Sequence, residues 1–175
     1  AREVAKLLGT HHHERMLTQS AAVDLLPKLR QWFDEPFADE SAMPTFLVSK
    51  VAKENVTVVL TGDGGDEVFG GYFWYPQMDA ADGSDLERFA PYYFDRDHDE
   101  MLEMVAEGYR GPDYTSAKVS HRLARMGDSA YLNRVLAFDT TTLIVDDPVK
   151  RVDNMTMAWG LEARVPFLDQ HLVEL

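Results

Sequence analysis

The residues of this chain that are best suited to chemistry lie in a glycine-rich, acidic loop. A run of mostly β-branched residues, Val56–Leu60, leads directly into Thr61-Gly62-Asp63-Gly64-Gly65-Asp66-Glu67. The glycines let a ligand approach the backbone closely, because no side chain stands in the way. The threonine hydroxyl and the backbone amides can then donate hydrogen bonds to that ligand. This combination is typical of the wall of a nucleotide site.

The carboxylates of the same loop decide which nucleotide chemistry is feasible. The loop has no lysine of the Walker A kind, and Asp63, Asp66 and Glu67 would repel a bare phosphate. Mg²⁺ removes that conflict, because it binds one or two carboxylates together with phosphate oxygens and waters. The loop therefore predicts a metal–nucleotide site, with a solvated acidic turn as the alternative.

A second stretch, residues 149–169, mixes charged and apolar residues too closely for a simple surface helix. We expect several of its charges to be partly buried and paired, because an unpaired buried charge costs several kcal/mol. The stretch is either a packing segment with internal ion pairs or a substrate-contact segment. Its charged residues include Lys150, Arg151, Asp153, Glu162, Arg164 and Asp169.

The elements that position the loop are predicted by an alternation of helical and extended patterns. We expect a strand over 12–17, a helix over 21–32 capped by Ser20, a helix over 44–53, and a buried strand over 56–60. Such an alternation predicts an α/β fold with a parallel sheet, in which ligands bind where the strands end. The core side of the first long helix should carry Val23, Leu26, Leu29 and Phe33.

The rest of the chain reads as mainly helical. Residues 1–8 have helical spacing that Gly9 ends, and further helices are expected over 97–107 and 131–144. Breaks are expected at Gly83-Ser84 and Gly111-Pro112.

Composition restricts the classes of partner. The 17 basic and 30 acidic residues give a net charge of −13, which argues against nucleic acid because phosphates require a basic surface. The chain has no cysteine, no apolar run of about 18 residues and no signal-like start, so we expect no membrane partner and a cytoplasmic location.

Four segments, taken in order, resemble the asparagine synthase family of glutamine-dependent amidotransferases. They are Leu8–Glu14, Asp34–Asp39, Leu60–Tyr72 and Arg151–Asp169, and the last contains Leu161-Glu162-Ala163-Arg164-Val165-Pro166-Phe167-Leu168-Asp169. The resemblance implies an adenine-nucleotide-binding core like that of ATP pyrophosphatases over about 1–75. It implies a mainly helical part over about 76–175, and it permits a homodimer.

The resemblance also implies an activity with ATP and Mg²⁺ as cofactors. ATP would adenylate the side-chain carboxylate of aspartate, and ammonia would attack the β-aspartyl-adenylate to give asparagine. In the intact protein a glutaminase domain would supply the ammonia from glutamine. The alternatives are a sister amidotransferase or β-lactam synthetase that acts on another carboxylate, a catalytically silent module, and a plain acidic metal-binding protein.

Site residues follow from the same resemblance, position by position. Asp66 matches the magnesium ligand, and Asp63 matches an acidic position beside the acyl-adenylate, where relatives often carry Glu. Arg164 and Glu162 are expected to support the substrate pocket, and Asp63 and Arg164 are the predicted catalytic residues. The predicted nucleotide-binding residues are Thr61, Gly62, Asp63, Gly64 and Gly65.

Some features of the family have no counterpart in the 175 residues. The Ser-Gly-Gly-x-Asp-Ser signature for pyrophosphate is absent, and no cysteine is present to serve the glutaminase half-reaction. We therefore expect an internal fragment of a synthetase domain, truncated at both ends and inactive alone.

Other residues invite functional readings that the pattern does not favour. His11, His12 and His13 would point to alternate faces of a strand, so a surface role is favoured over a metal site. The aromatic residues 73–75 and 92–94 are better explained by core packing than by adenine stacking. Asp146 and Asp147 form a turn before Pro148 or belong to a site.

Overall fold

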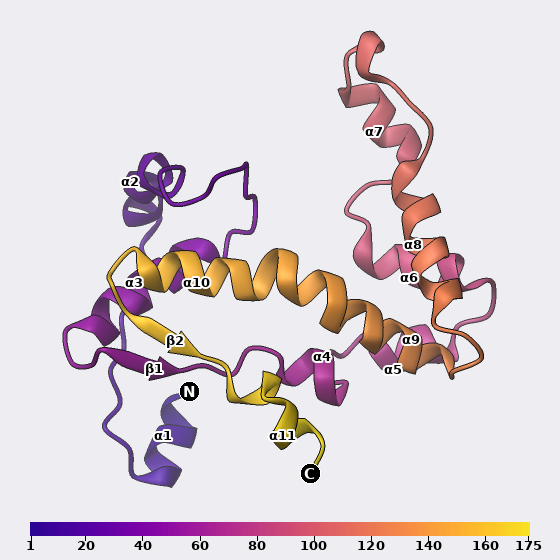
Figure 1. The fold of residues 1–175 in the computed structure, drawn as a ribbon. Helices are drawn as coiled ribbons and strands as arrows, with labels where there is room; N and C mark the ends of the chain where they lie inside the picture. The colour runs from indigo at the N-terminus through magenta and orange to yellow at the C-terminus, as the bar shows by residue number, and fades with distance from the viewer. The chain divides into compact units, whose positions relative to one another are not determined.

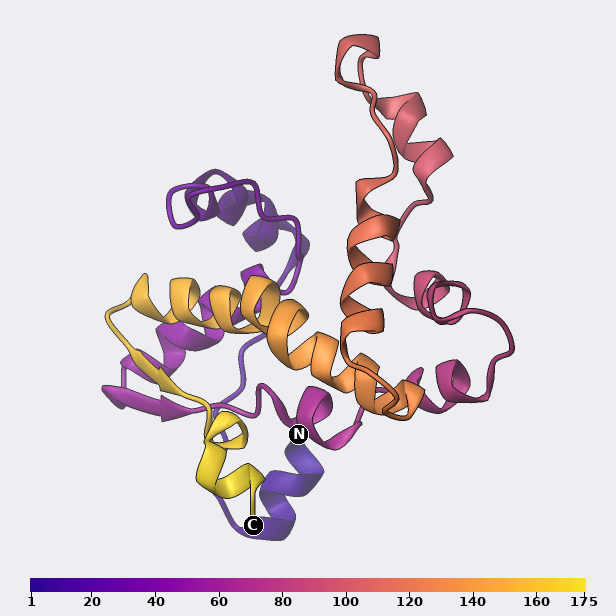
Figure 2. The same cartoon turned by 45° about the vertical axis from the view of Figure 1, so that its right-hand side comes forward.

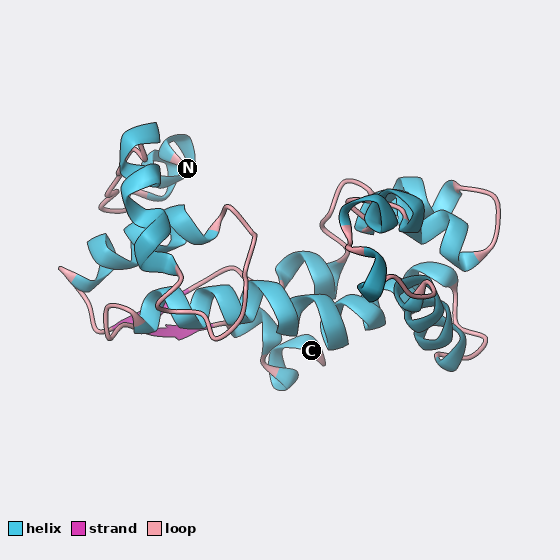
Figure 3. Ribbon diagram, turned by 90° about the horizontal axis from the view of Figure 1, so that it is seen from above, coloured by secondary structure: helices cyan, strands magenta, loops and turns pink.

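A computed structural model describes all residues from Ala1 to Leu175. The chain forms two compact units, which are described separately below. Unit 1 contains residues 1–63 and 146–172, and unit 2 contains residues 64–145 and 173–175. Helices dominate both, and the strands are confined to one small parallel sheet (Figure 3). The predicted α/β class is therefore confirmed in its coarse form, as a mostly helical chain with a two-stranded parallel sheet.

The sheet of unit 1 joins the strand before the glycine loop to the charged stretch of residues 149–169. Strand β1 (Val58–Leu60) pairs in parallel with β2 (Glu162–Arg164), with Leu60 opposite Arg164. Figure 2 shows the two strands side by side. The predicted strand over 56–60 is thus confirmed for its last three residues, whereas its partner strand was not predicted.

The expected burial of this strand is wrong. Val58 is 43% exposed and Leu60 is 69% exposed. The reason is the size of the sheet, because two short strands offer too little surface to bury both faces of β1.

Two helices form the core of unit 1 beside the sheet. Helix α10 (Lys150–Met157) packs against α3 (Ala42–Lys53) and against β2 (Figure 1). Phe46 and Met155 are buried between them, and the indole Nε1 of Trp159 donates a hydrogen bond of 3.0 Å to the carbonyl of Phe46. The predicted helix over 44–53 is confirmed and begins two residues earlier.

The first part of the chain confirms one predicted element and contradicts another. Helix α1 (Arg2–Leu8) ends at Gly9, whose φ of 64° is the left-handed conformation expected of a terminating glycine. Residues 12–17 form no strand. A strand needs a neighbour for its backbone hydrogen bonds, and the only sheet consists of β1 and β2. The three histidines at 11–13 are exposed.

Helix α2 (Gln19–Leu29) corresponds to the predicted helix over 21–32, but its cap and its buried face differ. The hydroxyl of Thr18 accepts a hydrogen bond of 3.3 Å from the amide of Ala21, so Ser20 lies inside the helix and does not cap it. Leu25 is buried, whereas Val23 and Leu26 are 60% and 55% exposed. Of the predicted core residues, Leu29 and Phe33 pack against the core.

Unit 2 is helical, as predicted for the second half of the chain. Its core contains the buried residues Tyr75, Met78, Phe89, Leu123 and Val135. The predicted helix over 97–107 is shorter, and the break at Gly83-Ser84 precedes a capping box between Ser84 and Glu87. The helices are α4 (Gly65–Phe69), α5 (Tyr75–Ala80), α6 (Asp85–Tyr93), α7 (His98–Met104), α8 (Tyr114–Arg125) and α9 (Tyr131–Phe138).

The helix predicted over 131–144 begins where expected and continues further. Two π-helical segments, Asp139–Leu143 and Val145–Val149, follow α9 and lead to α10. Asp146 and Asp147 therefore lie in helical structure and form no turn. The chain ends with a short helix, α11 (Gln170–Val173). None of the helices combines the length and apolar character that crossing a membrane requires.

The aromatic residues 73–75 and 92–94 mainly form core, as predicted. Tyr75 is 1% exposed, the rings of Phe89 and Tyr93 stack at 4.0 Å, and Trp74 packs against Tyr72. Phe73 and Tyr92 are exceptions, because their side chains are 75% and 37% exposed.

A buried carboxylate lies beneath these rings. Asp139 is fully buried, and its Oδ2 accepts hydrogen bonds from the hydroxyls of Tyr75, at 2.5 Å, and Tyr93. Burial raises the pKa of Asp139 to about 6, although the two tyrosine hydrogen bonds act in the opposite direction. The folded protein therefore binds this proton more tightly than the unfolded chain does.

This carboxylate predicts a pH-dependent stability. The contribution of protonated Asp139 is fully present below the unfolded pKa of about 3.9 and is lost as the pH rises through about 6. We expect urea titrations to show that the free energy of unfolding of wild type falls by about 2 kcal/mol relative to Asp139→Asn between pH 4 and pH 7. Equal pH dependence of the two proteins would contradict this assignment.

Candidate functional site

The first part of the predicted loop follows β1 directly in unit 1. The amide of Thr61 donates a hydrogen bond of 2.9 Å to the carbonyl of Arg164, which extends the strand pairing by one residue. The Thr61 hydroxyl is buried and has no hydrogen-bond partner within the protein. A buried hydroxyl without a partner is costly, so this atom is suited to a ligand or an ordered water. Open space surrounds Gly62, where a Cβ would meet nothing within 4 Å.

The second part of the loop opens unit 2. Gly64 has a φ of 88°, a left-handed conformation that side chains rarely adopt, and it precedes α4. Asp66 lies in the first turn of that helix, and its carbonyl accepts a hydrogen bond of 2.9 Å from the amide of Gly71. A Cβ on Gly71 would overlap the Asp66 carboxylate, so glycine at 71 leaves that carboxylate its place.

The structure contains no group of three or more His, Cys, Asp or Glu side chains that could hold a metal by themselves. A single carboxylate such as that of Asp66 is compatible with the way in which Mg²⁺ binds beside nucleotides, because there the phosphates and waters supply the remaining oxygens.

Glu67 differs from the other two loop carboxylates. It is 2% exposed, and its Oε1 accepts a hydrogen bond of 2.7 Å from the Tyr72 hydroxyl. Burial, together with the neighbouring Glu67 carboxylate, raises the pKa of Tyr72. Glu67 therefore holds α4 to the chain that follows it and does not face solvent, which corrects its grouping with the carboxylates that would repel a phosphate.

The predicted catalytic residue Arg164 lies on β2, and its side chain is exposed to solvent. Its Nε is 3.9 Å from Oε1 of Glu162, and the two side chains are 67% and 56% exposed. An exposed pair at that distance contributes little to stability, so both groups are available for other contacts. Their role at a substrate pocket stays a prediction.

Sequence reasoning missed the position of Arg151. Its guanidinium lies among three carboxylates of unit 1, those of Asp39, Asp63 and Asp147, and its side chain is 16% exposed. The preceding residue, Lys150, forms a separate ion pair with Glu35. Two charges of residues 149–169, Lys150 and Arg151, are thus partly buried and paired, as predicted, but their partners lie outside that stretch, partly at residues 34–39. The order of the two motifs along the chain gave no sign of this pairing.

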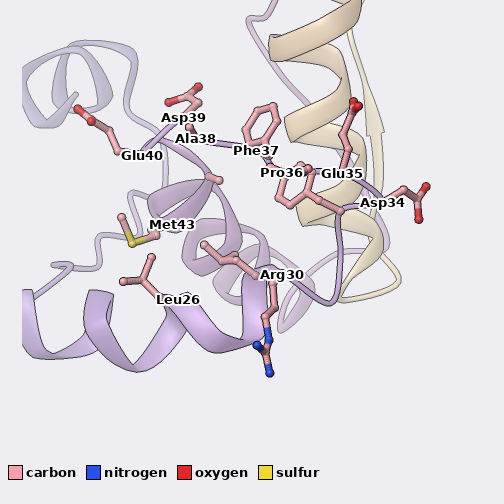
Figure 4. A pocket seen from close by; sticks show the side chains of 13 residues that line it. Leu26, Arg30, Asp34, Glu35, Pro36, Phe37, Ala38, Asp39, Glu40 and Met43 are labelled. Carbon is pink, nitrogen blue, oxygen red and sulfur yellow. The ribbon is translucent and has the colours of Figure 1, made fainter. Parts of the chain in front are cut away.

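A cavity of about 600 Å³ lies in unit 1 between α2, the following loop and α3, and Glu35 and Asp39 are among the residues that line it (Figure 4). Leu26 and Met43 line it, and the rings of Phe33 and Phe37 stack at 4.4 Å. In Figure 4, Asp34 and Glu35 extend outward from their loop. The cavity contains none of the predicted nucleotide or catalytic residues.

Comparison with known proteins shows the family. The sequence profile described as Asparagine synthase matches residues 1–175, so the chain belongs to the asparagine synthase family. No solved structure matches this chain.

Several curated relatives are named as asparagine synthetases. Asparagine synthetase [glutamine-hydrolyzing] 1 of Bacillus subtilis is 29% identical in an alignment 206 residues long that covers 97% of this chain and 32% of that protein. Asparagine synthetase [glutamine-hydrolyzing] 1 of Saccharomyces cerevisiae is 29% identical over 178 residues, covering 100% of this chain and 23% of that protein. A putative asparagine synthetase [glutamine-hydrolyzing] 2 of Methanocaldococcus jannaschii is 51% identical over 69 residues, which are 39% of this chain and 13% of that protein. The chain thus spans about a third or less of each relative's length.

Proposed function

We propose that the full-length protein containing this chain is a glutamine-dependent asparagine synthetase. The observation that carries the proposal is the match of all 175 residues to the asparagine synthase family. The names of the relatives favour aspartate as the carboxylate and glutamine as the nitrogen source. We further propose that this chain supplies part of the synthetase domain, with the nucleotide-binding part over about 1–75 and a mainly helical part over about 76–175.

In the proposed reaction the aspartate side-chain carboxylate attacks the α-phosphorus of ATP. A carboxylate–phosphorus bond forms and pyrophosphate leaves, which turns a poor acyl donor into a good one. Ammonia then attacks the acyl carbon, AMP departs with the carboxylate oxygen that became bonded to phosphorus, and the nitrogen loses a proton to give asparagine.

The residues of the loop have separate tasks in this proposal. Thr61 and Gly62 line the nucleotide, which would give the unpartnered Thr61 hydroxyl a hydrogen bond. Gly64 and Gly65 allow the backbone to approach the phosphates. Asp66 would hold Mg²⁺, which supplies neutralising charge to the phosphates. Asp63 is proposed to act beside the acyl-adenylate.

Arg164 is proposed to orient the carboxylate substrate from β2, because its guanidinium is exposed and always charged. The intact protein would obtain ammonia from a glutaminase domain, since the 175 residues contain no cysteine nucleophile.

The proposal is tested by incubating the full-length protein with ATP, Mg²⁺, ammonia and one carboxylate at a time. We expect pyrophosphate release that depends on aspartate and is matched by asparagine. Release with another carboxylate alone would assign the protein to a sister amidotransferase. No release with any carboxylate would indicate a silent module. We expect the 175-residue polypeptide by itself to form no asparagine, because it lacks the pyrophosphate-binding signature.

A further inference from the structure

The guanidinium of Arg151 has close partners at one nitrogen, Nη1, and only distant or no partners at Nη2 and Nε. Its Nη1 contacts a carboxylate oxygen of Asp39 and donates a hydrogen bond of 3.0 Å to Oδ1 of Asp147. Its Nη2 lies 3.9 Å from Oδ1 of Asp63, and its Nε is buried without any hydrogen-bond partner. Two of the three nitrogens are therefore free to make stronger bonds than they make in this structure.

The two carboxylates on Nη1 are themselves fixed. Asp39 accepts hydrogen bonds from the amide of Ser41 at 2.8 Å and from its hydroxyl at 2.6 Å. Burial alone would raise the pKa of Asp39, but these bonds and the charge of Arg151 hold that pKa below its usual value. Asp147 lies four residues before Arg151 in helical structure, so both project from adjacent turns. The position of the guanidinium is thus set by α10 and by the loop that precedes α3.

The chemistry of arginine suggests a role for Nε and Nη2. A guanidinium can present two parallel N–H groups to one carboxylate, and Nε with Nη2 forms such an edge. The carboxylate nearest to that edge is Asp63, whose side chain is only 20% exposed. A small movement of Asp63 would close this contact.

We propose that Arg151 is a positioning residue that orients Asp63 for the acyl-transfer chemistry. This inference rests on the proposed function, since it assigns a task to the predicted catalytic carboxylate. Asp63 follows β1 by three residues and, in a loop rich in glycine, has few local restraints of its own. Arg151 supplies the missing restraint from a helix, with Asp39 as the anchor behind it.

Two other roles for Arg151 make different predictions. If Arg151 only held residues 34–39 against α10, its loss would lower the free energy of unfolding, and its effect on activity would not depend on Asp63. If it bound the substrate carboxylate directly, its loss would raise the KM for aspartate far more than it lowered kcat. A positioning role predicts a fall in kcat that depends on Asp63 being present.

The test compares variants of the full-length protein in the aspartate-dependent pyrophosphate assay. Arg151→Gln should lower kcat by roughly 10- to 100-fold with little change in the KM for aspartate. Arg151→Lys should recover part of the loss, and Asp39→Asn should lower kcat by less than Arg151→Gln does. Lys150→Gln is the matched control, because it removes a neighbouring ion pair of the same helix that does not reach Asp63.

A double variant separates positioning from packing. In the Asp63→Asn background, Arg151→Gln should cause little further loss of kcat, because the carboxylate it orients is already gone. Three results would overturn the inference in a protein whose wild type is active. The losses of kcat could multiply in the double variant, Arg151→Gln could lower kcat no more than Lys150→Gln does, or Arg151→Gln could change only the KM for aspartate. An inactive wild type would instead reject the proposed function, and the inference with it.

Discussion

Replacing Asp66 by Asn in the full-length protein is expected to lower aspartate-dependent pyrophosphate release by about 100-fold or more. The substitution keeps the shape of the side chain and removes the negative charge that Mg²⁺ requires. The cation that Asp66 would hold would stabilise the charge that develops on the transferring adenylyl group, and such stabilisation commonly contributes that much to a rate. The effect should weaken as Mg²⁺ is raised, because the remaining oxygens still bind the ion.

The measurement is a magnesium titration of pyrophosphate release at saturating ATP and aspartate. Asp82→Asn serves as the control, since it removes one charge from an exposed position in the same unit. Wild-type rates and an unchanged magnesium dependence in Asp66→Asn would show that this carboxylate does not hold the metal.

Replacing Met155 by Ala is expected to lower the free energy of unfolding by about 2–5 kcal/mol. Met155 is fully buried between α10 and α3, so truncation leaves a cavity in the core of unit 1. It also lies one turn after Arg151 on the same face of α10. Loosening this face should therefore lower activity as well.

The neighbouring methionine provides the control for that experiment. Met157 belongs to the same helix and is 53% exposed, so Met157→Ala should change the free energy of unfolding by no more than about 0.5 kcal/mol. Urea titrations of the two variants give the comparison directly. Similar losses in both would mean that α10 does not present the face described here.

Local patterns predicted the elements whose signals are local. Gly9 ended α1, and α3 and the end of β1 fell where their residues indicated. The strand expected over 12–17 failed because strand formation depends on a partner that local sequence does not reveal.

Burial was harder to predict than helix formation. Helix α2 packs Leu29 against the core as expected, but Val23 and Leu26 are exposed and Leu25 is buried in their place. Several apolar residues compete for one face of an amphipathic helix, and the neighbouring helix decides which of them is covered. The strand β1 was expected to be buried, and two strands cannot achieve this.

In the candidate site, too, the sequence predicted local features but not contacts between distant residues. Motif spacing located the glycine loop and predicted that several charges of residues 149–169 are paired, but it did not show that the partners of Lys150 and Arg151 lie outside that stretch. It could not show that Arg151 reaches Asp39, because that contact joins residues 112 positions apart. Nor could it show that Glu67 is buried in unit 2 while Asp66, the preceding residue, is exposed. Such facts depend on tertiary packing.

The central claim, adenylation of aspartate, is tested most directly by following oxygen atoms. The full-length protein is incubated with ATP, Mg²⁺, ammonia and aspartate labelled with ¹⁸O in its side-chain carboxylate, and the products are analysed by mass spectrometry. Attack on the α-phosphorus predicts that AMP carries one ¹⁸O per asparagine formed. Label in inorganic phosphate accompanied by ADP, or AMP without label, would contradict an aspartyl-adenylate and with it the account given for Asp63 and Asp66.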